Sequence, residues 1–377
     1  MMKKIYSLFK KLDIVLLIAW LLAIISSFII APGREYLGYI DLRSLGILWG
    51  LMVVIQGFKE NSVFVKIAGL LLSKVGRGWQ LAAVLIYLCF FTSMFITNDV
   101  ALITFVPFAL MILSSCKCED MMIPTVVLQT VAANLGSMLT PIGNPQNLYL
   151  YGLTGMGLMQ FVKILLPYSL ISAVLLGVAA FIMIPDRNRS LVTAKESAIV
   201  SRFGSLRQVI IYSILFAIAI LSVVRVLPWY VFCLIVLVVV GGMDYKILFR
   251  ADYVLLMTFI GFFIFTGNMA RIDVISLFLQ NTLAGREFPI SIALSQVISN
   301  VPATLMLSGF TDNYGDLLLG VNIGGLGTLI ASMASLISYK AYTGEYRKKR
   351  GRYILTFTVV NLAFLAILVG MYLFLKV

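Results

Sequence analysis

The strongest constraint on the fold is a polar pattern that occurs twice, each time inside a stretch too apolar to face water. The first copy reads TNDVALITFVP at 97–107 and NLGSMLTPIGNPQNL at 134–148. The second reads SNVPATLMLS at 299–308 and NIGGLGTLIASMASL at 322–336. Aligning the two longer segments pairs Asn134 with Asn322, Gly136 with Gly324, Thr140 with Thr328, Ile142 with Ile330 and Leu148 with Leu336. Two halves of the chain therefore share one plan, and such interrupted apolar segments at matching places are typical of the substrate site of a secondary transporter.

The composition places this chain in a lipid bilayer. Hydrophobic residues make up 61% of it and charged residues 12%, whereas about a quarter of the residues of a soluble domain are charged. Apolar runs long enough to cross a bilayer recur from 14–30 onward to 353–375. The first run lacks a small-residue cleavage site, so we expect a retained helix and not a signal peptide. The sequence predicts an all-α polytopic protein of the cytoplasmic (plasma) membrane.

The net charge of +13 is spread over many loops and forms no single basic patch. Of the 29 Lys and Arg residues, 22 lie in loops that we place in the cytoplasm, at 1–13, 58–78, 114–121, 185–207, 243–252 and 340–352. The others, which fall outside or at the outer rim, are Arg34, Arg43, Lys163, Arg225, Arg271, Arg286 and Lys376. This bias follows the positive-inside rule, so we expect the N-terminus inside and the C-terminus outside. We expect no nucleic-acid partner.

Two apolar stretches do not fit single crossings. Segment 79–113 would be about 52 Å long as one helix; its centre is Thr97-Asn98-Asp99, and both of its flanks are basic. We therefore expect a re-entrant hairpin that enters from the cytoplasm and returns there. Segment 288–310 has the same form around Ser299-Asn300, but its flanks face outward under the charge count. It should enter from the opposite side, because irregular backbone at that depth needs protein or a water-filled cavity around it.

Each hairpin is followed by a span that is broken in its middle. Pro141 and Pro145 each remove a backbone donor, and the glycines permit conformations that a helix forbids. We expect about nine transmembrane spans plus two re-entrant hairpins and two broken helices. The spans lie at about 14–31, 40–57, 122–150, 161–184, 208–226, 229–242, 253–269, 317–339 and 353–375. The first inverted repeat is 1–184, with hairpin 79–113 and broken span 122–150; a cytoplasmic loop and linking span follow at 185–228; the second repeat is 229–377, with hairpin 288–310 and broken span 317–339.

Asp99 is exceptional among the 16 acidic residues because apolar runs lie on both of its sides. An ionised carboxylate at that depth costs at least about 2.5 kcal/mol, which makes Asp99 a candidate functional residue. It can be held there protonated or paired with a bound cation, so the sequence predicts a proton-coupled or cation-coupled switch. The alternative is a carboxylate that caps the second hairpin helix. The two interpretations are compatible, because capping leaves the charge in place.

Asn98 and Asn300 lie where one short helix ends and the next begins. The ending helix offers carbonyl oxygens to a cation, and the starting helix offers amide donors to an anion. Small hydroxyl residues in membrane helices also serve close packing, which is the alternative for each Ser and Thr. The candidate substrate-binding or ion-binding residues are Thr97, Asn98, Asp99, Asn134, Thr140, Gly143, Asn144, Ser299, Asn300, Thr304, Asn322, Thr328 and Ser332, with Asn147 and Ser335 as further polar groups.

Neither metal chemistry nor catalysis is indicated. The chain contains no His, and its four cysteines show no paired metal-ligand spacing. We expect Cys116 and Cys118 to be a reduced pair without a role, with a thiol site for a soft metalloid as the alternative. An embedded enzyme would lack a nucleophile and base, and a channel would need a continuous polar pore. We expect no catalytic residue and no cofactor, only a coupling ion, H+ or Na+, with sodium held at Asn98 and Asn300.

The paired motifs resemble the ion-transporter superfamily, which includes arsenite/antimonite permeases, a class of sodium/proton antiporters, citrate carriers and sodium-coupled dicarboxylate carriers. TNDVALITFVP and SNVPATLML, each followed by a broken span with glycine and threonine, carry this resemblance, which covers about residues 40–375. It implies that the hairpin tips and the facing broken helices form the site and move as an elevator against a scaffold. By position, Asn98 with backbone 140–144 would hold one cation or substrate oxygen, and Asn300 with backbone 328–332 the other side.

The tips differ from those of dicarboxylate carriers, which typically read Ser-Asn-Thr. Here they read Thr97-Asn98-Asp99 and Ser299-Asn300-Val301. Asn-Asp at the first tip is more similar to the arsenite permease and sodium/proton antiporter branches. We expect a secondary transporter, assembled as a homodimer, that moves a small anion or an uncharged oxyacid with protons or sodium coupled through Asp99. A sodium/proton antiporter is the alternative.

Overall fold

The computed structural model describes residues 14–72, 75–185 and 204–376, and its regular elements in these ranges are helices. The proposed cytoplasmic segment 1–13 and most of 185–207 lie outside the described residues. Within the described ranges, eight helical segments are long and apolar enough to cross a membrane. They are α4 (Leu42–Glu60), α6 (Gly78–Ile96), α7 (Asn98–Ser115), α10 (Leu158–Met183), α12 (Leu206–Val223), α13 (Trp229–Leu248), α14 (Tyr253–Ala270) and the segment Arg347–Lys376, which contains α20 (Arg350–Lys376). The prediction of an all-α polytopic membrane protein is confirmed.

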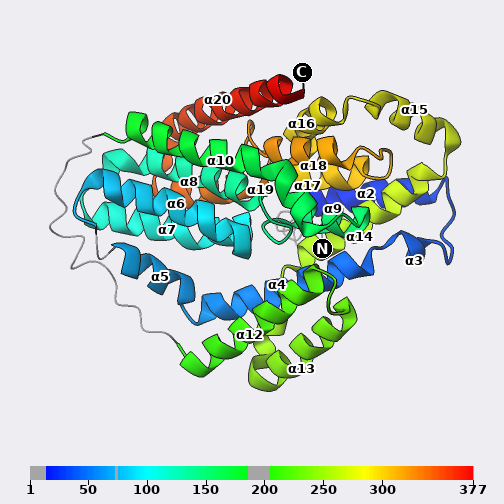
Figure 1. The fold of residues 1–377 in the computed structure, drawn as a ribbon, viewed down its shortest axis with the longest axis horizontal. Coiled ribbons are helices and arrows are strands. Elements are labelled where there is room, and N and C mark those ends of the chain that lie inside the picture. Colours follow the sequence, from blue (N-terminus) through cyan, green and yellow to red (C-terminus); the bar gives the residue numbers. More distant parts are fainter. Residues whose placement is uncertain (1–13, 73–74, 186–203, 377) are drawn as a thin grey trace, which may run out of the picture.

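Helices pair at the two places where the sequence predicts hairpins. The chain reverses at Thr97 between α6 and α7, and at Ser299 between α16 (Glu287–Ile298) and α17 (Asn300–Leu307). Figure 1 shows the two pairs reaching toward the middle of the molecule from opposite ends. Both turning residues have positive φ angles, 69° and 78°, in a backbone region that residues other than glycine rarely adopt. The two tips share one unusual backbone conformation.

The helix after each hairpin is interrupted, also as the sequence predicts. In the first half α8 (Met122–Ser137) ends before α9 (Pro145–Thr154) begins; in the second half α18 (Tyr314–Ile323) ends before α19 (Met333–Glu345). Asn144 caps α9 by accepting a hydrogen bond from the backbone N–H of Asn147, and Pro145 occupies its first turn, where a missing donor is harmless. We call the segments between these helices the first and second break.

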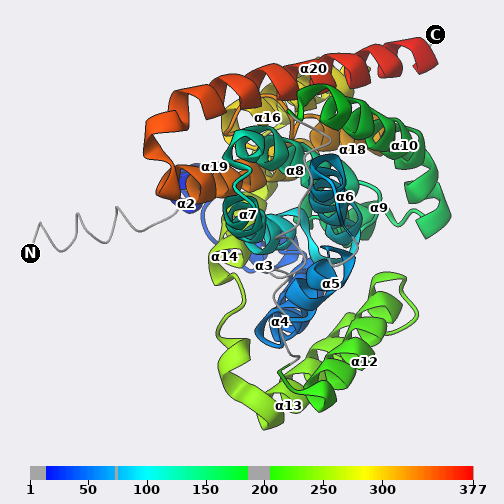
Figure 2. The ribbon, with the colours of Figure 1, turned by 90° about the vertical axis from the view of Figure 1, so that its left-hand side faces the viewer.

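The helices sort into two groups that meet along a seam. One group, the frame, has α4 packed on α12 and α13, and α14 packed on α2 (Ile14–Ser27). The other, the bundle, contains α6 to α10 and α16 to α20, and Figure 2 shows α12 and α13 standing apart from it. The seam is made by α4 against α9 and by α14 against α17. Shorter elements are α3 (Tyr36–Tyr39), α5 (Val63–Leu72), α15 (Asp273–Leu283), η1 (Glu119–Met121) and η2 (Arg347–Lys349).

The two halves exchange helices within the frame. Helix α2 of the first half packs on α14 of the second, where Ala19 lies against Gly261. Helix α13 of the second half packs on α4 of the first, with Trp229 against Gly46 and Phe232 against Gly50. The predicted end of the span 229–242 corresponds to a kink at Asp244 inside α13, after which the helix continues to Leu248. The halves interlock instead of standing side by side.

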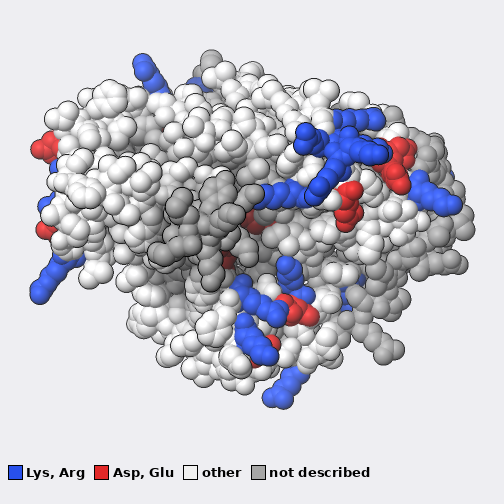
Figure 3. Space-filling model, turned by 180° about the vertical axis from the view of Figure 1, so that it is seen from behind, with Lys and Arg blue, Asp and Glu red and all other residues white. Residues whose placement is uncertain are grey.

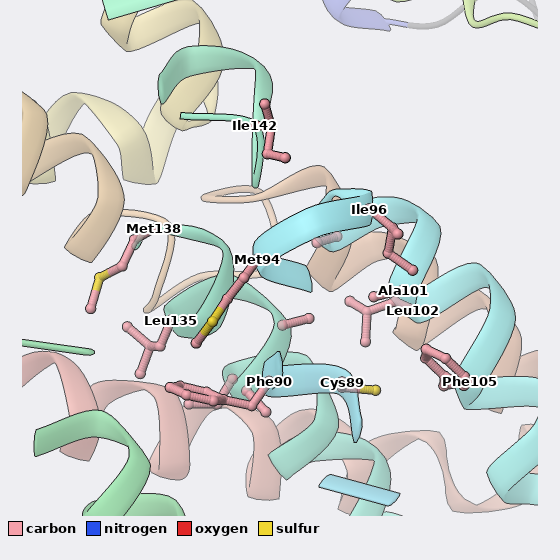
Figure 4. Packing of buried hydrophobic residues seen from close by; sticks show 14 of the residues in the cluster. Cys89, Phe90, Met94, Ile96, Ala101, Leu102, Phe105, Leu135, Met138 and Ile142 are labelled. Carbon is pink, nitrogen blue, oxygen red and sulfur yellow. The ribbon is translucent and has the colours of Figure 1, made fainter. Parts of the chain in front are cut away.

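Close packing fixes the first hairpin against α8. In Figure 4, Phe90 and Met94 of α6 lie next to Leu135 of α8, all within one continuous buried cluster. Leu102 and Phe105 of α7 are fully buried in the same cluster. Because lipid tails are as apolar as these side chains, van der Waals packing holds such helices together, with little hydrophobic driving force. The tip is thereby held at a defined place.

Charged side chains gather at particular places on the surface. In Figure 3, Lys and Arg cluster mainly over the right half of the view, with Asp and Glu beside them, and broad uncharged areas surround them. Exposed basic residues around the start of α20 include Arg347, Lys348, Lys349, Arg350 and Arg352. Such clusters next to apolar helices are expected where a membrane protein meets the aqueous phase.

Candidate substrate and ion site

Each hairpin tip docks onto the break of its own half through the same backbone hydrogen bond. The N–H of Asn98 donates to the carbonyl of Gly143, at 3.1 Å, and the N–H of Asn300 donates to the carbonyl of Ala331, at 3.0 Å. Gly143 and Ala331 occupy equivalent positions in the alignment of the two halves. The first orphan donor of each second hairpin helix is therefore satisfied by the facing break.

A threonine in each break makes a second, matching contact. The hydroxyl of Thr140 donates to the carbonyl of Met94, and the hydroxyl of Thr328 donates to the carbonyl of Gln296, at 3.1 Å in the second case. Each acceptor lies near the end of the first helix of its own hairpin, where carbonyls have no intrahelical partner. The two threonines therefore position the tips, and their hydroxyls are used in doing so.

Close approach between hairpin and break also recurs at equivalent glycines. A Cβ atom at Gly136 would lie 2.1 Å from the carbonyl oxygen of Phe90, and one at Gly324 would lie 2.9 Å from the hydroxyl of Ser295. Any side chain at either position would push the hairpin away from the broken helix. The glycine pair that the sequence alignment matches thus has a common structural role.

The breaks of the two halves are joined across the centre of the bundle. The hydroxyl of Ser332 donates to Asn134 Oδ1 at 3.0 Å, and Asn144 Nδ2 donates to Asn322 Oδ1 at 3.0 Å. The alignment that pairs Asn134 with Asn322 also pairs Asn144 with Ser332, so the two hydrogen bonds are equivalent. All four side chains are buried. The structure brings these four predicted residues together in one polar centre.

Asn98 also binds to this centre, in which one donor, on Asn134, has no partner among the described residues. Asn98 Nδ2 donates to Asn134 Oδ1 at 3.1 Å, so that oxygen accepts two hydrogen bonds, one from each half. Asn134 Nδ2 is buried and has no partner in the described part of the chain. Leaving such a donor unsatisfied costs about 1–3 kcal/mol. The polar centre therefore has a free amide donor at the point where the two halves meet.

Asp99 lies beside the polar centre with its carboxylate uncommitted. The carboxylate makes no hydrogen bond or ion pair with the residues that the structure describes, and the side chain is partly buried. The N-cap position of α7 is Thr97, without a side-chain cap, and the N–H of Asp99 itself donates to Asn98 Oδ1 at 3.0 Å. The carboxylate does not cap α7, so the capping alternative has no support in this geometry.

The other predicted residues contribute to different extents. Thr97 and Asn144 line a cavity of about 30 Å³ between the first tip and Leu51 of α4. The hydroxyl of Ser299 donates to the Ala331 carbonyl at 3.4 Å, which supports the second tip. Thr304 bonds the carbonyl of Asn300 within its own helix, at 2.7 Å, so its hydroxyl is used for back-bonding there.

Two side chains matter more than the sequence suggested. Asn147, which was only a further polar group, accepts a hydrogen bond at Oδ1 from Asn322 Nδ2, at 2.7 Å. Gln296, which sequence reasoning missed, donates from Nε2 to the carbonyls of Gly324 and Leu326, at 2.9 and 3.0 Å. Its signal was a long amide one turn before the second tip, at the place that Met94 takes before the first tip.

The cysteines and acidic residues form no metal centre in the described ranges. Those ranges contain no group of three or more His, Cys, Asp or Glu side chains that could hold a metal ion. Cys118 is buried. The pKa of the Cys116 thiol is raised, mainly because that thiol is partly buried and secondly because the Cys118 thiol lies nearby. A thiol with a raised pKa is a poor ligand at neutral pH, because the thiolate is the form that binds soft ions.

Helical hairpins docked on broken helices in two matching halves are typical of membrane transporters built on internal repeats. The chain belongs to the citrate transporter family, which it matches over residues 1–313. This family assignment confirms the resemblance to the ion-transporter superfamily.

Two relatives match most of the chain. An uncharacterized transporter of Methanocaldococcus jannaschii is 32% identical over 338 residues, which cover 89% of this chain and 90% of that protein. The inner membrane protein YbiR of Escherichia coli is 26% identical over 320 residues, which cover 84% of each. The protein is therefore a multi-pass membrane transporter.

Proposed function

We propose that this transporter carries a small anion or an uncharged oxyacid across the plasma membrane, coupled to protons or sodium. The observation that carries the proposal is the buried Nδ2 donor of Asn134 in the polar centre, which has no partner among the described residues. A carboxylate or oxyacid oxygen would satisfy that donor, and both tip asparagines lie at starts of helices, which favour negative charge. The citrate transporter family supports the same chemistry, since citrate is a carboxylate.

Asp99 supplies the proposed coupling. An anion that enters an apolar bundle must bring a compensating positive charge, because isolated charge is costly at that depth. The uncommitted carboxylate next to Asn98 can take up a proton or hold sodium when the solute binds. A sodium/proton antiporter remains the second candidate, because the same carboxylate could exchange the two ions without a solute.

An elevator-like movement fits the two helix groups. The hydrogen bonds between Asn144 and Asn322 and between Ser332 and Asn134 tie both breaks together inside the bundle. Apolar residues, among them Leu51 and Leu148, line the small cavity between α4 and the bundle. A rigid bundle that slides along an apolar seam would carry its polar centre from one side of the frame to the other.

Flux measurements on purified protein in liposomes test this function. Citrate, phosphate and arsenite should be offered singly, with proton and sodium gradients imposed separately. We expect uptake of at least one of them, accelerated by one of the two gradients. If none is taken up while a sodium gradient drives proton movement, the antiporter is correct and the anion proposal is wrong.

A further inference from the structure

A pocket of about 280 Å³ lies between the end of α10, the start of α20 and the start of α8, away from the polar centre. Helices α10 and α20 both pack on α8, and Figure 1 and Figure 2 show them on the same side of the bundle. Part of the lining is apolar, from Ile123 and Pro124 of α8 and Met183 at the end of α10. The pocket is far larger than the roughly 30 Å³ that one water molecule occupies in the liquid. It therefore has room for a molecular group and not only for an ion or a water.

The pocket takes its charged side chains from two parts of the chain. The short helix η1 supplies Glu119 and Asp120, whereas Lys349 of η2 and Arg352 in the first turn of α20 supply positive charge. Lys349 Nζ lies 4.0 Å from Glu119 Oε2, and both side chains are more than half exposed. Such a loose surface pair stabilises little, so a ligand can separate its partners. Arg352 is exposed and forms no ion pair with the described residues. The pocket therefore offers both carboxylate acceptors and cationic donors to one ligand.

The charged part of the pocket borders an exposed apolar surface. On α10, Ile182 next to Met183 is 70% exposed, and on α20, Leu355 about one turn after Arg352 is 66% exposed. Exposed apolar side chains on membrane-spanning helices are expected to contact lipid. The charge pattern of the sequence places η1 and η2 on the cytoplasmic side. By this pattern the pocket lies at the level of the headgroups of the cytoplasmic leaflet.

We propose that this pocket binds a membrane phospholipid whose headgroup carries a phosphate and a primary ammonium group, as phosphatidylethanolamine does. The phosphate would lie on Arg352 and Lys349, because charge-assisted hydrogen bonds from such donors to phosphate are strong. The ammonium group, which has three N–H donors, would bind Glu119, and Asp120 adds negative charge beside it. A lipid with negative charge alone would face two carboxylates, so the mixed signs favour the zwitterionic headgroup. The acyl chains would follow the apolar surface along α10 and α20.

Native mass spectrometry of the purified protein in detergent tests this site without any transport assay. Phosphatidylethanolamine is titrated in parallel with phosphatidylcholine of the same acyl chains, which has the same net charge but no N–H donor on its headgroup. The wild type should bind the former about tenfold more tightly, which corresponds to about 1.4 kcal/mol. Glu119→Gln should remove this preference without weakening phosphatidylcholine. Arg352→Gln should weaken both lipids about tenfold, because both carry the phosphate. Glu345→Gln and Lys348→Gln, which change exposed residues outside the pocket, are the charge-matched controls.

Four results would overturn the proposal. Equal binding of the two lipids by the wild type, or a preference that survives in Glu119→Gln, would exclude the ammonium contact. Tighter binding of phosphatidylglycerol than of phosphatidylethanolamine would show that the pocket selects anionic lipids. If soluble glycerophosphoethanolamine competes with the lipid at equal concentration, the ligand is a soluble phosphate compound and not a lipid. If Arg352→Gln does not fold, Arg352→Lys keeps the charge, loses the fork and should weaken both lipids by a smaller factor; unchanged affinity would refute the phosphate contact.

Discussion

The two breaks have the same backbone plan but are stabilised by different side chains. In the first break, Asn147 Nδ2 donates to the carbonyls of Met138 and Thr140, at 2.9 and 3.1 Å. Asn147 belongs to α9, which directly follows that break. In the second break, the side chain that binds the freed carbonyls is Gln296, which belongs to the hairpin helix α16. Its Oε1 also accepts a hydrogen bond from the N–H of Thr328 at 2.9 Å.

Because Asn147 comes from the broken helix and Gln296 from the hairpin, the two hairpins are attached to their breaks in different ways. Gln296 binds the second hairpin to its break by side-chain hydrogen bonds, whereas Met94, at the equivalent position, offers only its carbonyl to Thr140. Ser335, which aligns with Asn147, has a buried hydroxyl without a partner in the described chain. The second half is therefore tied more firmly, and the first half, whose tip carries Asp99 where the second carries Val301, is the half with the ionisable group. Two halves with the same backbone plan can thus differ in role, with the second half more firmly attached and the first half carrying the ionisable group.

The prediction with the largest expected effect concerns the side of the membrane from which each hairpin enters. Single cysteines at Gly76 and Ser115, in a background without the native cysteines, should react only with an impermeant reagent on the cytoplasmic side. Cysteines at Gly285 and Asp312 should react only from outside. All four positions are exposed. Labelling of 76 and 115 from opposite faces would show that this segment crosses the membrane as a whole and is not a re-entrant hairpin.

Asp99→Asn should cause the next largest loss. The variant keeps the size of the side chain but fixes its neutral form, so gradient-driven flux should fall about 10- to 100-fold, the range of typical coupling free energies. Its pH dependence should vanish while thermal stability is kept. Flux into liposomes at several external pH values measures this, with Asp273→Asn, an exposed acid, as the matched control. Wild-type flux with wild-type pH dependence would place coupling elsewhere.

Asn98→Ala and Asn300→Ala compare the two tips. Asn98 donates directly into the polar centre, so its loss should raise the half-saturation concentration of solute or ion about tenfold, for about 1.4 kcal/mol. Asn300 should show a similar effect if both tips share one ligand. The double variant should then deviate from additivity, because groups that share a ligand are energetically coupled. Additive effects at matched thermal stability would indicate two independent sites.

Gln296→Met tests the different attachment of the second hairpin. Methionine at this position copies the first half and strands the carbonyls and the Thr328 N–H that Gln296 satisfies. The free energy of unfolding should fall by about 1–3 kcal/mol, as measured by denaturant or thermal unfolding. Met94→Gln is the reciprocal control and should cost less, because Asn147 already serves the first break. Equal losses would mean that the two attachments are equivalent.

The sequence predicted the positions of tips and breaks because backbone chemistry dictates them. Prolines, glycines and asparagines interrupt helices wherever they occur in such apolar stretches, so Thr97, Ser299 and both breaks were found within a few residues. The division of work between Asn147 and Gln296 was not predictable. It depends on which side chain reaches the freed carbonyls once α8 packs on α6 and α18 on α16, and spacing along the chain carries no information about that reach. Asp99 was placed correctly at the tip, but its lack of a capping bond appears only in three dimensions.

The exchange of helices within the frame bears on how the protein is made. Helix α4 leaves the ribosome long before α13, whose Trp229 and Phe232 rings cover Gly46 and Gly50. Helix α2 likewise waits for α14. During synthesis the first half must therefore stay in the bilayer with surfaces that only lipid covers, and its final shape is reached when the second half arrives. Assembly is thus delayed to the end of translation, and damage late in the chain would leave the earliest helices without their partners.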